Sequence, residues 1–260
     1  MSLEIRRRAH AKVNPFLRVL GRRPDGFHEV ETLVHPIDLA DDLTVRQIPK
    51  GFVLRVEGEL AADVPAGPEN LVVRAAAAMR AACAGGGGAE IVLVKRIPVA
   101  AGLGGGSADA AAVIDALGEL WGCADVAGRV AASVGSDVPA LLAETPVLAR
   151  GRGELVEPAE VAPCRWRVIP AGFGIAAGDA YGWWDEDGGH TGQDPSELLE
   201  ALAAGDLDTA GPLLFNDLEG PILRRHPELG EAKARLLAEG AFGAVISGSG
   251  PSVAGLYPVV

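Results

Sequence analysis

The stretch PVAAGLGGGSADAAA, residues 98–112, constrains the fold of this chain more than any other segment. Glycines at 102 and at 104–106 stand directly before an alanine-rich run that favours a helix. Glycines at this density free the backbone from steric limits, so several consecutive N–H groups can turn toward one point. A helix that begins near Ser107 adds its own unpaired N–H groups and the positive end of its dipole. The segment therefore predicts a loop that binds phosphate.

The residues of this stretch do not match three other glycine-containing motifs. A Walker loop needs Lys and then Ser or Thr directly after its last glycine, but Ser107 and Ala108 follow. A dinucleotide fingerprint that starts at Gly102 needs Gly or Ala where Ser107 stands, and a serine-hydrolase elbow needs Gly where Asp109 stands. The remaining alternative is a flexible connection between a strand and a helix. In a phosphate loop we expect Gly104 or Gly105 to adopt a positive φ, whereas we interpret the glycines at 85–88 as a plain surface loop.

The periodicity of apolar residues outlines the rest of the fold. Residues 4–60 read as short, mostly antiparallel strands. The pattern then predicts helices over 70–84, 108–121 and 124–134, a short helix that opens at Asp137, and strands over 91–97 and 147–150. In the second half it predicts a strand over 166–176, an aromatic and acidic loop over 178–192, helices over 196–204, 206–214 and 227–239, and strands over 242–246 and 253–257. We therefore expect an α+β chain with one domain over 1–155 and a second over 156–260.

Composition narrows the class of protein. The chain has 260 residues, of which 48% are hydrophobic and 22% charged, as in a globular protein. A net charge of −12 argues against nucleic acid as the main ligand. The sequence has no apolar segment typical of an export signal or a membrane helix. Three widely spaced cysteines fit neither a metal site nor a disulfide framework, so we expect a reducing, cytoplasmic environment.

Several further segments join the glycine loop in a recognisable set. They are AKVN at 11–14, GRRPDGFHEVETL at 21–33, GSDVP at 135–139, FNDLE at 215–219 and GSGPS at 248–252. In order and spacing the set resembles the GHMP kinases, the galactokinase, homoserine, mevalonate and phosphomevalonate kinase superfamily. DGFHEVETL beside AKVN is similar to the branch that acts on a cytidine diphosphate ester of methylerythritol. The resemblance covers about 11–50, 90–157 and 213–257.

The resemblance implies a two-domain fold and an activity. The expected fold has an N-terminal mixed α/β nucleotide-binding domain, a C-terminal ferredoxin-like α+β domain, and an active site in the cleft between them. The expected reaction is ATP-dependent phosphorylation of the 2-hydroxyl of 4-diphosphocytidyl-2-C-methyl-D-erythritol. ATP and Mg²⁺ are the expected cofactors, with the metal ligands unassigned, and we expect a monomer or weak homodimer.

Two residues are expected to be catalytic. A hydroxyl is a poor nucleophile, so a carboxylate that accepts its proton assists phosphoryl transfer, and Asp137 is the candidate. From the sequence alone Asp137 is more often a helix cap than a base. The ammonium of Lys12 would act by Coulomb attraction on the base and the attacking hydroxyl, although a single Lys is more often a solvated side chain. The resemblance favours the catalytic interpretation of both residues.

The resemblance also implies which positions bind the substrate and ATP. For the substrate these are Asn14, which orients it, Phe27 and His28, which hold cytidine, and Tyr181, which covers the opposite face. Phe27 could otherwise be a core residue and His28 a surface histidine. For ATP the positions are Asn70, Lys95, Pro98, Val99, Ala100, Ala101, Gly102, Leu103, Gly104, Gly105, Gly106, Ser107 and Ala108. A second glycine turn at Gly248, Ser249 and Gly250 is expected to support the phosphate loop.

Two departures from the family pattern concern the substrate side. Val34 stands where the family often has Phe, and Ala176 and Ala177 stand where it usually has Ser-Thr. The alternatives are another kinase of the superfamily, for homoserine or phosphomevalonate, and an inactive nucleotide-binding module. DGFHEVETL argues against the first, and the joint presence of Lys12 and Asp137 argues against the second.

Overall fold

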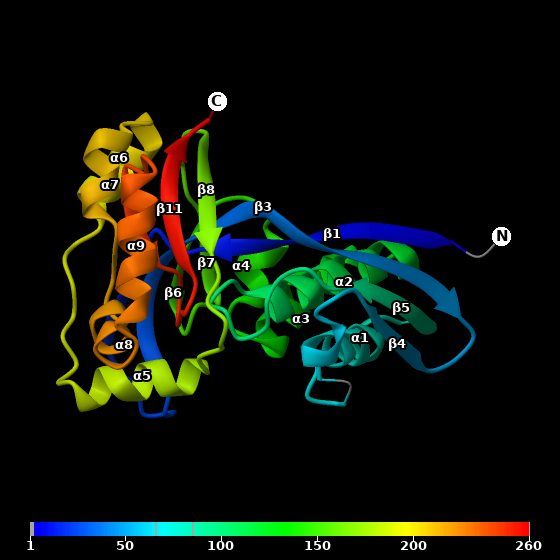
Figure 1. Ribbon diagram of the computed structural model, residues 1–260. Coiled ribbons are helices and arrows are strands. Elements are labelled where there is room, and N and C mark those ends of the chain that lie inside the picture. The colour runs from blue at the N-terminus through cyan, green and yellow to red at the C-terminus, as the bar shows by residue number, and fades with distance from the viewer. Residues whose placement is uncertain (1–2, 66, 85, 260) are drawn as a thin grey trace. The chain divides into compact units, whose positions relative to one another are not determined.

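The computed structural model describes residues 3–65, 67–84 and 86–259. They form two compact units, each assembled from separate stretches of the chain. The first unit draws on residues 1–11, 38–99 and 104–144, and the second on 12–37, 100–103 and 145–260. The long strand β3 (His28–Ile48) gives its first part to the second unit and its last part to the first (Figure 1). The expected division of the chain at 155/156 stays a prediction.

The sheet of the first unit is built along the end of β3. There β3 pairs antiparallel with β5 (Gly88–Val94), and β5 pairs parallel with β4 (Phe52–Glu57). β1 (Glu4–Val13) also pairs with β3. Leu43 and Val45 on β3, with Ile91 and Leu93 on β5, alternate with more exposed residues and are buried. This alternation is typical of a sheet with one covered face.

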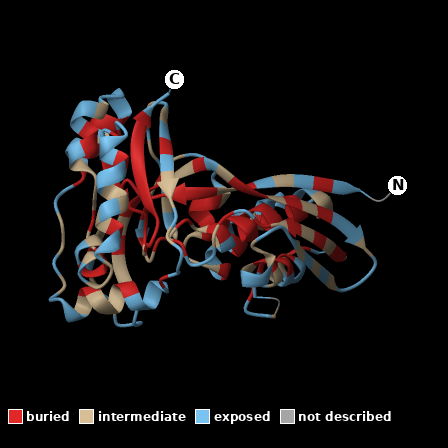
Figure 2. Cartoon of the chain, viewed as in Figure 1, coloured by how far each residue is buried: buried red, intermediate tan, exposed pale blue. Residues whose placement is uncertain are grey.

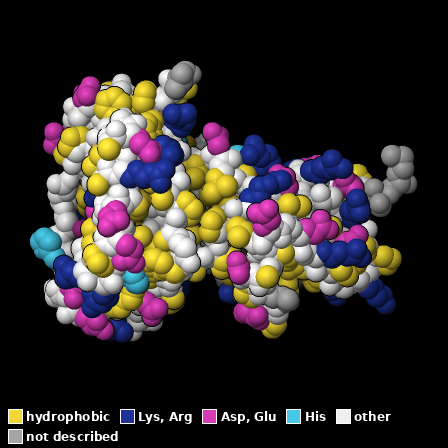
Figure 3. Space-filling model, viewed as in Figure 1, with side chains coloured by type: hydrophobic (Ala, Val, Ile, Leu, Met, Phe, Trp, Pro, Cys, Tyr) yellow, Lys and Arg dark blue, Asp and Glu magenta, His cyan; other side chains and the backbone are white. Residues whose placement is uncertain are grey.

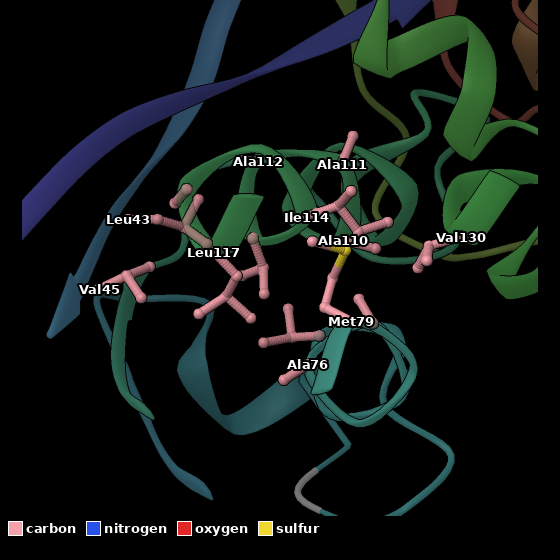
Figure 4. Close-up of a cluster of buried hydrophobic side chains, with 14 of the residues drawn as sticks. Leu43, Val45, Ala76, Met79, Ala110, Ala111, Ala112, Ile114, Leu117 and Val130 are labelled. Carbon is pink, nitrogen blue, oxygen red and sulfur yellow. The ribbon is translucent and has the colours of Figure 1, made fainter. Parts of the chain in front are cut away.

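Two helices share one core with this sheet. They are α1 (Leu71–Ala82) and α2 (Gly105–Trp121). Figure 4 shows Ala76 and Met79 of α1 beside Ile114 and Leu117 of α2, with Leu43 and Val45 of β3 beyond them. The small residues Ala110, Ala111 and Ala112 are buried too, and their short side chains let the neighbouring elements approach α2. The unit is completed by η1 (Ala61–Asp63), η2 (Ala124–Val126), α3 (Ala127–Val134) and α4 (Val138–Leu142).

A disulfide joins Cys83, directly after α1, to Cys123, just beyond α2. The expectation of three free cysteines is therefore wrong for this pair, and only Cys164 is free among the described residues. Spacing along the chain could not indicate the pair, because the bond depends on the C-terminal ends of two packed helices lying together, with 5.9 Å between the Cα atoms.

The second unit contains two groups of strands. In one group β2 (Phe16–Arg22) and β6 (Val147–Gly151) pair antiparallel with the start of β3, β7 (Leu155–Pro158) pairs with β6, and β9 (Phe215–Asn216) pairs parallel with β2. The other group has the order β10 (Gly243–Ile246), β11 (Val253–Pro258), β8 (Cys164–Ile169), all antiparallel. β11 is buried along nearly its whole length (Figure 2).

Helices pack onto the second group of strands. α9 (Glu228–Ala238) contacts β10 and β11, and the Tyr257 hydroxyl donates to the Leu236 carbonyl at 3.1 Å. Trp184 of α5 (Ala177–Glu186) and Ile222 of α8 (Glu219–Arg225) belong to the same core. The remaining helices are α6 (Ser196–Ala204) and α7 (Leu207–Leu213).

Several expected elements differ from the structure. Residues 178–192 are not a loop throughout, because α5 forms there and buries Ala180 and Trp184, which lie one turn apart. α8 was missed, and β8 lies at 164–169 instead of 166–176. Residues 124–134 begin as a 3₁₀ turn before α3.

The glycines at 86–88 are not a plain surface loop. Gly88 is the buried first residue of β5, and a side chain at Gly86 would meet the Trp121 ring at 3.1 Å. The expectation is therefore wrong for Gly88. Gly86 and Gly87 lie outside helices and strands, as expected, but a side chain at either would contact Trp121 or Gln47 closely, and Gly85 lies outside the described residues.

Charged side chains of both signs are interspersed over the visible surface of each unit (Figure 3). In the part of the chain that the structure describes, no helix is long and apolar enough to cross a bilayer.

Candidate active site

The phosphate loop has the backbone that its glycines predict. Gly104, with φ +70°, is the left-handed residue that precedes α2, and Gly102 has φ +74°. Gly105 is instead the first helical residue, so α2 begins three positions before the expected start at 108. The N–H groups of the first turn of α2 are thus available at the end of the loop, where an anion is stabilised. Ala100 also has a positive φ of +53°, a conformation that costs an L residue about 1 kcal/mol.

The middle of the loop is fastened within the second unit. The Gly102 carbonyl accepts hydrogen bonds from the Lys12 ammonium at 2.7 Å and from the Ser247 hydroxyl at 3.0 Å. The Ser252 N–H donates to Ala101 and the Ile175 N–H to Ala100. Each of these bonds holds a loop carbonyl in place.

The second glycine turn lies against this loop. A side chain at Gly102 would come within 2.1 Å of the Ser247 carbonyl oxygen and 2.8 Å of the Gly250 nitrogen. Gly248 has φ +55°, and a side chain there would meet the Lys12 ammonium at 2.7 Å. Both glycines are therefore required by close approach as well as by conformation. Ser249, between Gly248 and Gly250, belongs to the same turn.

Lys12 and Asn14 begin a buried polar chain. Lys12 donates from its ammonium to the Asn14 side-chain oxygen at 2.6 Å, and the Asn14 amide donates to the Thr32 hydroxyl at 2.8 Å. Thr32 in turn donates to the Phe16 carbonyl at 2.6 Å. These hydrogen bonds fix the orientation of the Asn14 amide and hold the Lys12 ammonium in place. Lys12 is only 4% exposed, so it is not a solvated surface lysine.

Two residues of the FNDLE segment, Asn216 and Asp217, have structural roles that the sequence does not predict. The Asn216 amide donates to the carbonyls of Ile246 and Gly248 at 2.8 and 2.7 Å, so it fixes the second glycine turn. Asp217 accepts the Val19 and Gly192 N–H groups, and burial raises the pKa of its carboxyl. The FNDLE motif was the available signal for Asn216, but the two carbonyls that the Asn216 amide binds lie about thirty residues away.

Asp137, in the first unit, precedes α4 at the position of a helix cap. Its side chain makes no capping hydrogen bond, although its carbonyl accepts the Leu141 N–H at 3.1 Å. Pro139 in the first turn gives α4 its start, as expected. The carboxylate is therefore not used to cap the helix.

Asn70 and Lys95 have structural partners in the first unit. Asn70 caps α1, since its side-chain oxygen accepts the Val72 N–H at 2.8 Å while its amide donates to the Pro65 carbonyl. Lys95 is buried, and its ammonium donates to Asp41 at 2.5 Å and to Asp109 at 2.8 Å. Burial raises the pKa of Asp109 to about 7, an effect that Lys95 opposes and the Asp41 charge reinforces.

The aromatic residues expected at the substrate lie in the second unit. His28 and Tyr181 are stacked, with ring centroids 4.8 Å apart, and the His28 Nε2 lies 3.0 Å from Asp185. Phe27 is 50% exposed, so it is not a core residue, and the Arg152 guanidinium lies over its ring at 4.9 Å. Val34, one of the departures, is buried.

The magnesium ligands remain unassigned. Among the described residues, no three His, Cys, Asp or Glu side chains are grouped so that they could hold a metal ion. Mg²⁺ in nucleotide sites is commonly bound by one or two side chains together with phosphate oxygens and water. The residues present are compatible with an ion held mainly by the phosphates of ATP.

Family models match both halves of the chain. The model described as GHMP kinases N terminal domain matches residues 70–144, and the one described as GHMP kinases C terminal matches 198–258.

Curated relatives match nearly the whole chain. A 4-diphosphocytidyl-2-C-methyl-D-erythritol kinase from Pelotomaculum thermopropionicum is 44% identical over 255 residues, which is 95% of this chain and 87% of the relative. The enzyme of the same name from Symbiobacterium thermophilum is 43% identical over 96% of this chain and 89% of its own length.

Solved structures agree with these matches. A crystal structure of 4-(cytidine 5'-diphospho)-2C-methyl-D-erythritol kinase superposes with a TM-score of 0.83 at 40% identity, covering 97% of this chain and 90% of the other. Homoserine kinase from Cytophaga hutchinsonii has a TM-score of 0.71 at 20% identity over 98% of this chain and 85% of its own, a likeness that shows the fold alone.

Proposed function

Because this chain belongs to the GHMP kinase family, we propose that it transfers the terminal phosphoryl group of ATP to the 2-hydroxyl of 4-diphosphocytidyl-2-C-methyl-D-erythritol. The products are the 2-phosphate and ADP, in the methylerythritol phosphate route to isoprenoid precursors. The observation that carries the proposal is the buried Lys12 ammonium on the Gly102 carbonyl, which joins a candidate catalytic cation to the phosphate loop.

The loop would bind ATP through its backbone. Residues 98–108 would surround the phosphates, with the N–H groups of the first turn of α2 directed at the oxygens. Asn70 caps the start of α1, and Lys95 supports the loop through its bond to Asp109 of α2. Mg²⁺, bound to the phosphates, would neutralise part of their charge.

The chemical step would use Asp137 and Lys12. The substrate hydroxyl oxygen attacks the terminal phosphorus, the bond to the ADP oxygen breaks, and Asp137 accepts the hydroxyl proton. The Lys12 ammonium would stabilise the negative charge that develops on the transferred group. Asn14, held by Thr32, would orient the substrate.

Cytidine recognition would involve Phe27, His28 and Tyr181. An exposed phenyl ring and a stacked imidazole–phenol pair offer flat apolar faces for a pyrimidine ring. Asp185 restrains the His28 ring at 3.0 Å, so the imidazole has a fixed orientation. His28 would then hydrogen-bond to the edge of the cytosine ring.

A coupled assay of ADP release tests the proposal with three acceptors in parallel. We expect turnover with 4-diphosphocytidyl-2-C-methyl-D-erythritol and only background rates with homoserine and phosphomevalonate. Turnover of either of the other two acceptors alone would reassign the substrate, and no turnover with bound ATP would favour an inactive module.

We further propose a cytoplasmic location, because the reaction consumes ATP, and a monomer or weak homodimer that does not bind nucleic acid. Light scattering after size-exclusion chromatography measures the assembly state directly.

A further inference from the structure

Three charged side chains are buried together beneath the start of α2, and the mechanism above does not use them chemically. They are Asp41 on β3, Lys95 just after β5, and Asp109 on α2, exposed by 0%, 3% and 2%. Lys95 is bonded to both carboxylates. Burying three charges is costly unless they are paired and hydrogen-bonded, so the set should contribute something beyond general stability.

Asp41 holds the segment that enters the phosphate loop. One of its carboxylate oxygens accepts the N–H groups of Arg96 and Ile97, the latter at 2.9 Å, and the other accepts from Lys95. The Lys95 N–H also donates to the Glu57 carbonyl at 2.8 Å. The backbone over 95–97 is therefore fixed immediately before Pro98.

Asp109 holds the segment that leaves the loop. It lies four residues after Gly105, so its bond to Lys95 restrains the first turn of α2. A side chain at Gly105 would meet Ile97 at 2.8 Å and the Lys95 ammonium at 3.0 Å, which shows how closely the two ends of the loop approach each other. Lys95 thus connects the residues before the loop, the residues after it, and β3.

One polar atom in this set has no partner. The second carboxylate oxygen of Asp109 is buried and accepts no hydrogen bond from any described residue. Buried polar atoms are rarely left unsatisfied without a functional reason. The Lys95 ammonium, in contrast, donates to both carboxylates of the set, so its position is explained without a ligand.

We propose that Asp41, Lys95 and Asp109 are positioning residues that hold the two ends of the phosphate loop in register for the phosphates of ATP. Lys95 acts through the two carboxylates and does not touch the adenine. The proposal rests on the proposed function only insofar as the ligand of the loop is a nucleoside polyphosphate. It gives Lys95, which the sequence assigns to ATP binding, an indirect role in that binding.

The test compares a phosphate-bearing ligand with one that lacks phosphate. Dissociation constants for ATP and for adenosine are measured by calorimetry, with competition for the weaker ligand, on the full chain and on Asp109→Ala. We expect the constant for ATP to rise about tenfold and that for adenosine to change less than twofold, because only the phosphates depend on the loop. Asp109→Asn, which keeps an acceptor for Lys95, should recover most of the loss.

Glu90→Ala is the matched control. Glu90 lies on β5 and is ion-paired with Arg55 at 3.1 Å, a partly exposed pair that includes neither end of the loop. We expect both constants to stay at their wild-type values. Thermal melting of every variant shows whether it is folded at the temperature of the measurement.

An equal loss of ATP and adenosine affinity in folded Asp109→Ala would overturn the proposal in favour of a contact with the nucleoside. Unchanged ATP affinity would overturn it as well. If Asp109→Ala does not fold, the comparison is made with Asp41→Asn, which replaces one of the two carboxylate oxygens that hold residues 95–97, and a loss confined to ATP is still expected. Because calorimetry needs no acceptor, failure of the proposed phosphorylation reaction would leave this result readable.

Discussion

The ammonium of Lys12 lies 2.7 Å from the carbonyl oxygen of Gly102, a residue 90 positions later in the chain. The same oxygen accepts the Ser247 hydroxyl. A candidate catalytic cation, the phosphate loop and the second glycine turn are thus linked through one backbone atom. Small changes at this atom should therefore have large effects on activity.

Gly102→Ala should abolish most of the activity. The new methyl group would lie 2.1 Å from the Ser247 carbonyl oxygen, and φ at this position is +74°, so the loop must move away from the turn. We expect kcat/KM to fall at least about a hundredfold, measured by ADP release. Gly172→Ala is the control, since nothing lies within 4 Å of the new atom, and it should keep full activity.

Asp137→Asn should lower turnover by about 10²- to 10⁴-fold, the usual range for loss of a general base. ATP binding by calorimetry should survive, because the side chain makes no capping bond on which α4 depends. Comparable losses of ATP affinity and turnover would instead assign Asp137 a structural role.

Phe27→Ala should weaken binding of the cytidine substrate. A stacked ring contributes about 1 kcal/mol beyond its buried area, so we expect the KM for that substrate to rise about tenfold and the KM for ATP to stay unchanged. Phe173→Ala removes another exposed ring, stacked on His226 elsewhere in the second unit, and should change neither constant. A change in the ATP constant alone would contradict the assignment of Phe27.

Removing the Cys83–Cys123 disulfide should lower thermal stability. The bond closes a segment with a sequence separation of 40, and loop-closure entropy gives about 4 kcal/mol for that length. We expect Cys83→Ser/Cys123→Ser to melt about 10 °C lower than the oxidised protein in calorimetry. Adding a reductant should lower the melting temperature of the wild-type chain but not that of the double variant.

The contribution of Asp109 to the stability of the protein should fall as pH rises from about 4 to about 7. The folded-state pKa is about 7, whereas an unfolded Asp titrates near 4, so in this window the folded state holds a proton that the unfolded chain has lost. Raising the pH through 7 removes that contribution. Asp109→Asn cannot lose the proton, so urea unfolding at pH 5 and 8 should show a smaller difference than in wild type. An identical difference would show that Asp109 titrates normally.

Local signals predicted the loop and its helix well. The glycines before α2 specify their own backbone, and Gly104 has the left-handed conformation that such a motif requires. Lys12 and Asp137 could be named as candidates because motif positions are local in sequence, and their catalytic roles stay predictions.

Contacts between residues far apart in the chain could not be predicted from local sequence patterns. Asn216 matters because of carbonyls thirty residues away, and Asp41 because of N–H groups that lie more than fifty residues later. α5 was missed since Gly178 and Gly182 lower its helix propensity, which burial of Trp184 outweighs. No periodicity in the sequence reports such contacts.

The disulfide has a consequence for the integrity of the polypeptide. Cys83 and Cys123 stand on either side of the phosphate loop, so the chain between them is a closed covalent ring. A single peptide-bond break anywhere within the ring leaves both fragments joined through the sulfur atoms. The loop would stay attached to α1 from one side and α2 from the other, and a nicked chain would separate into two pieces only after reduction.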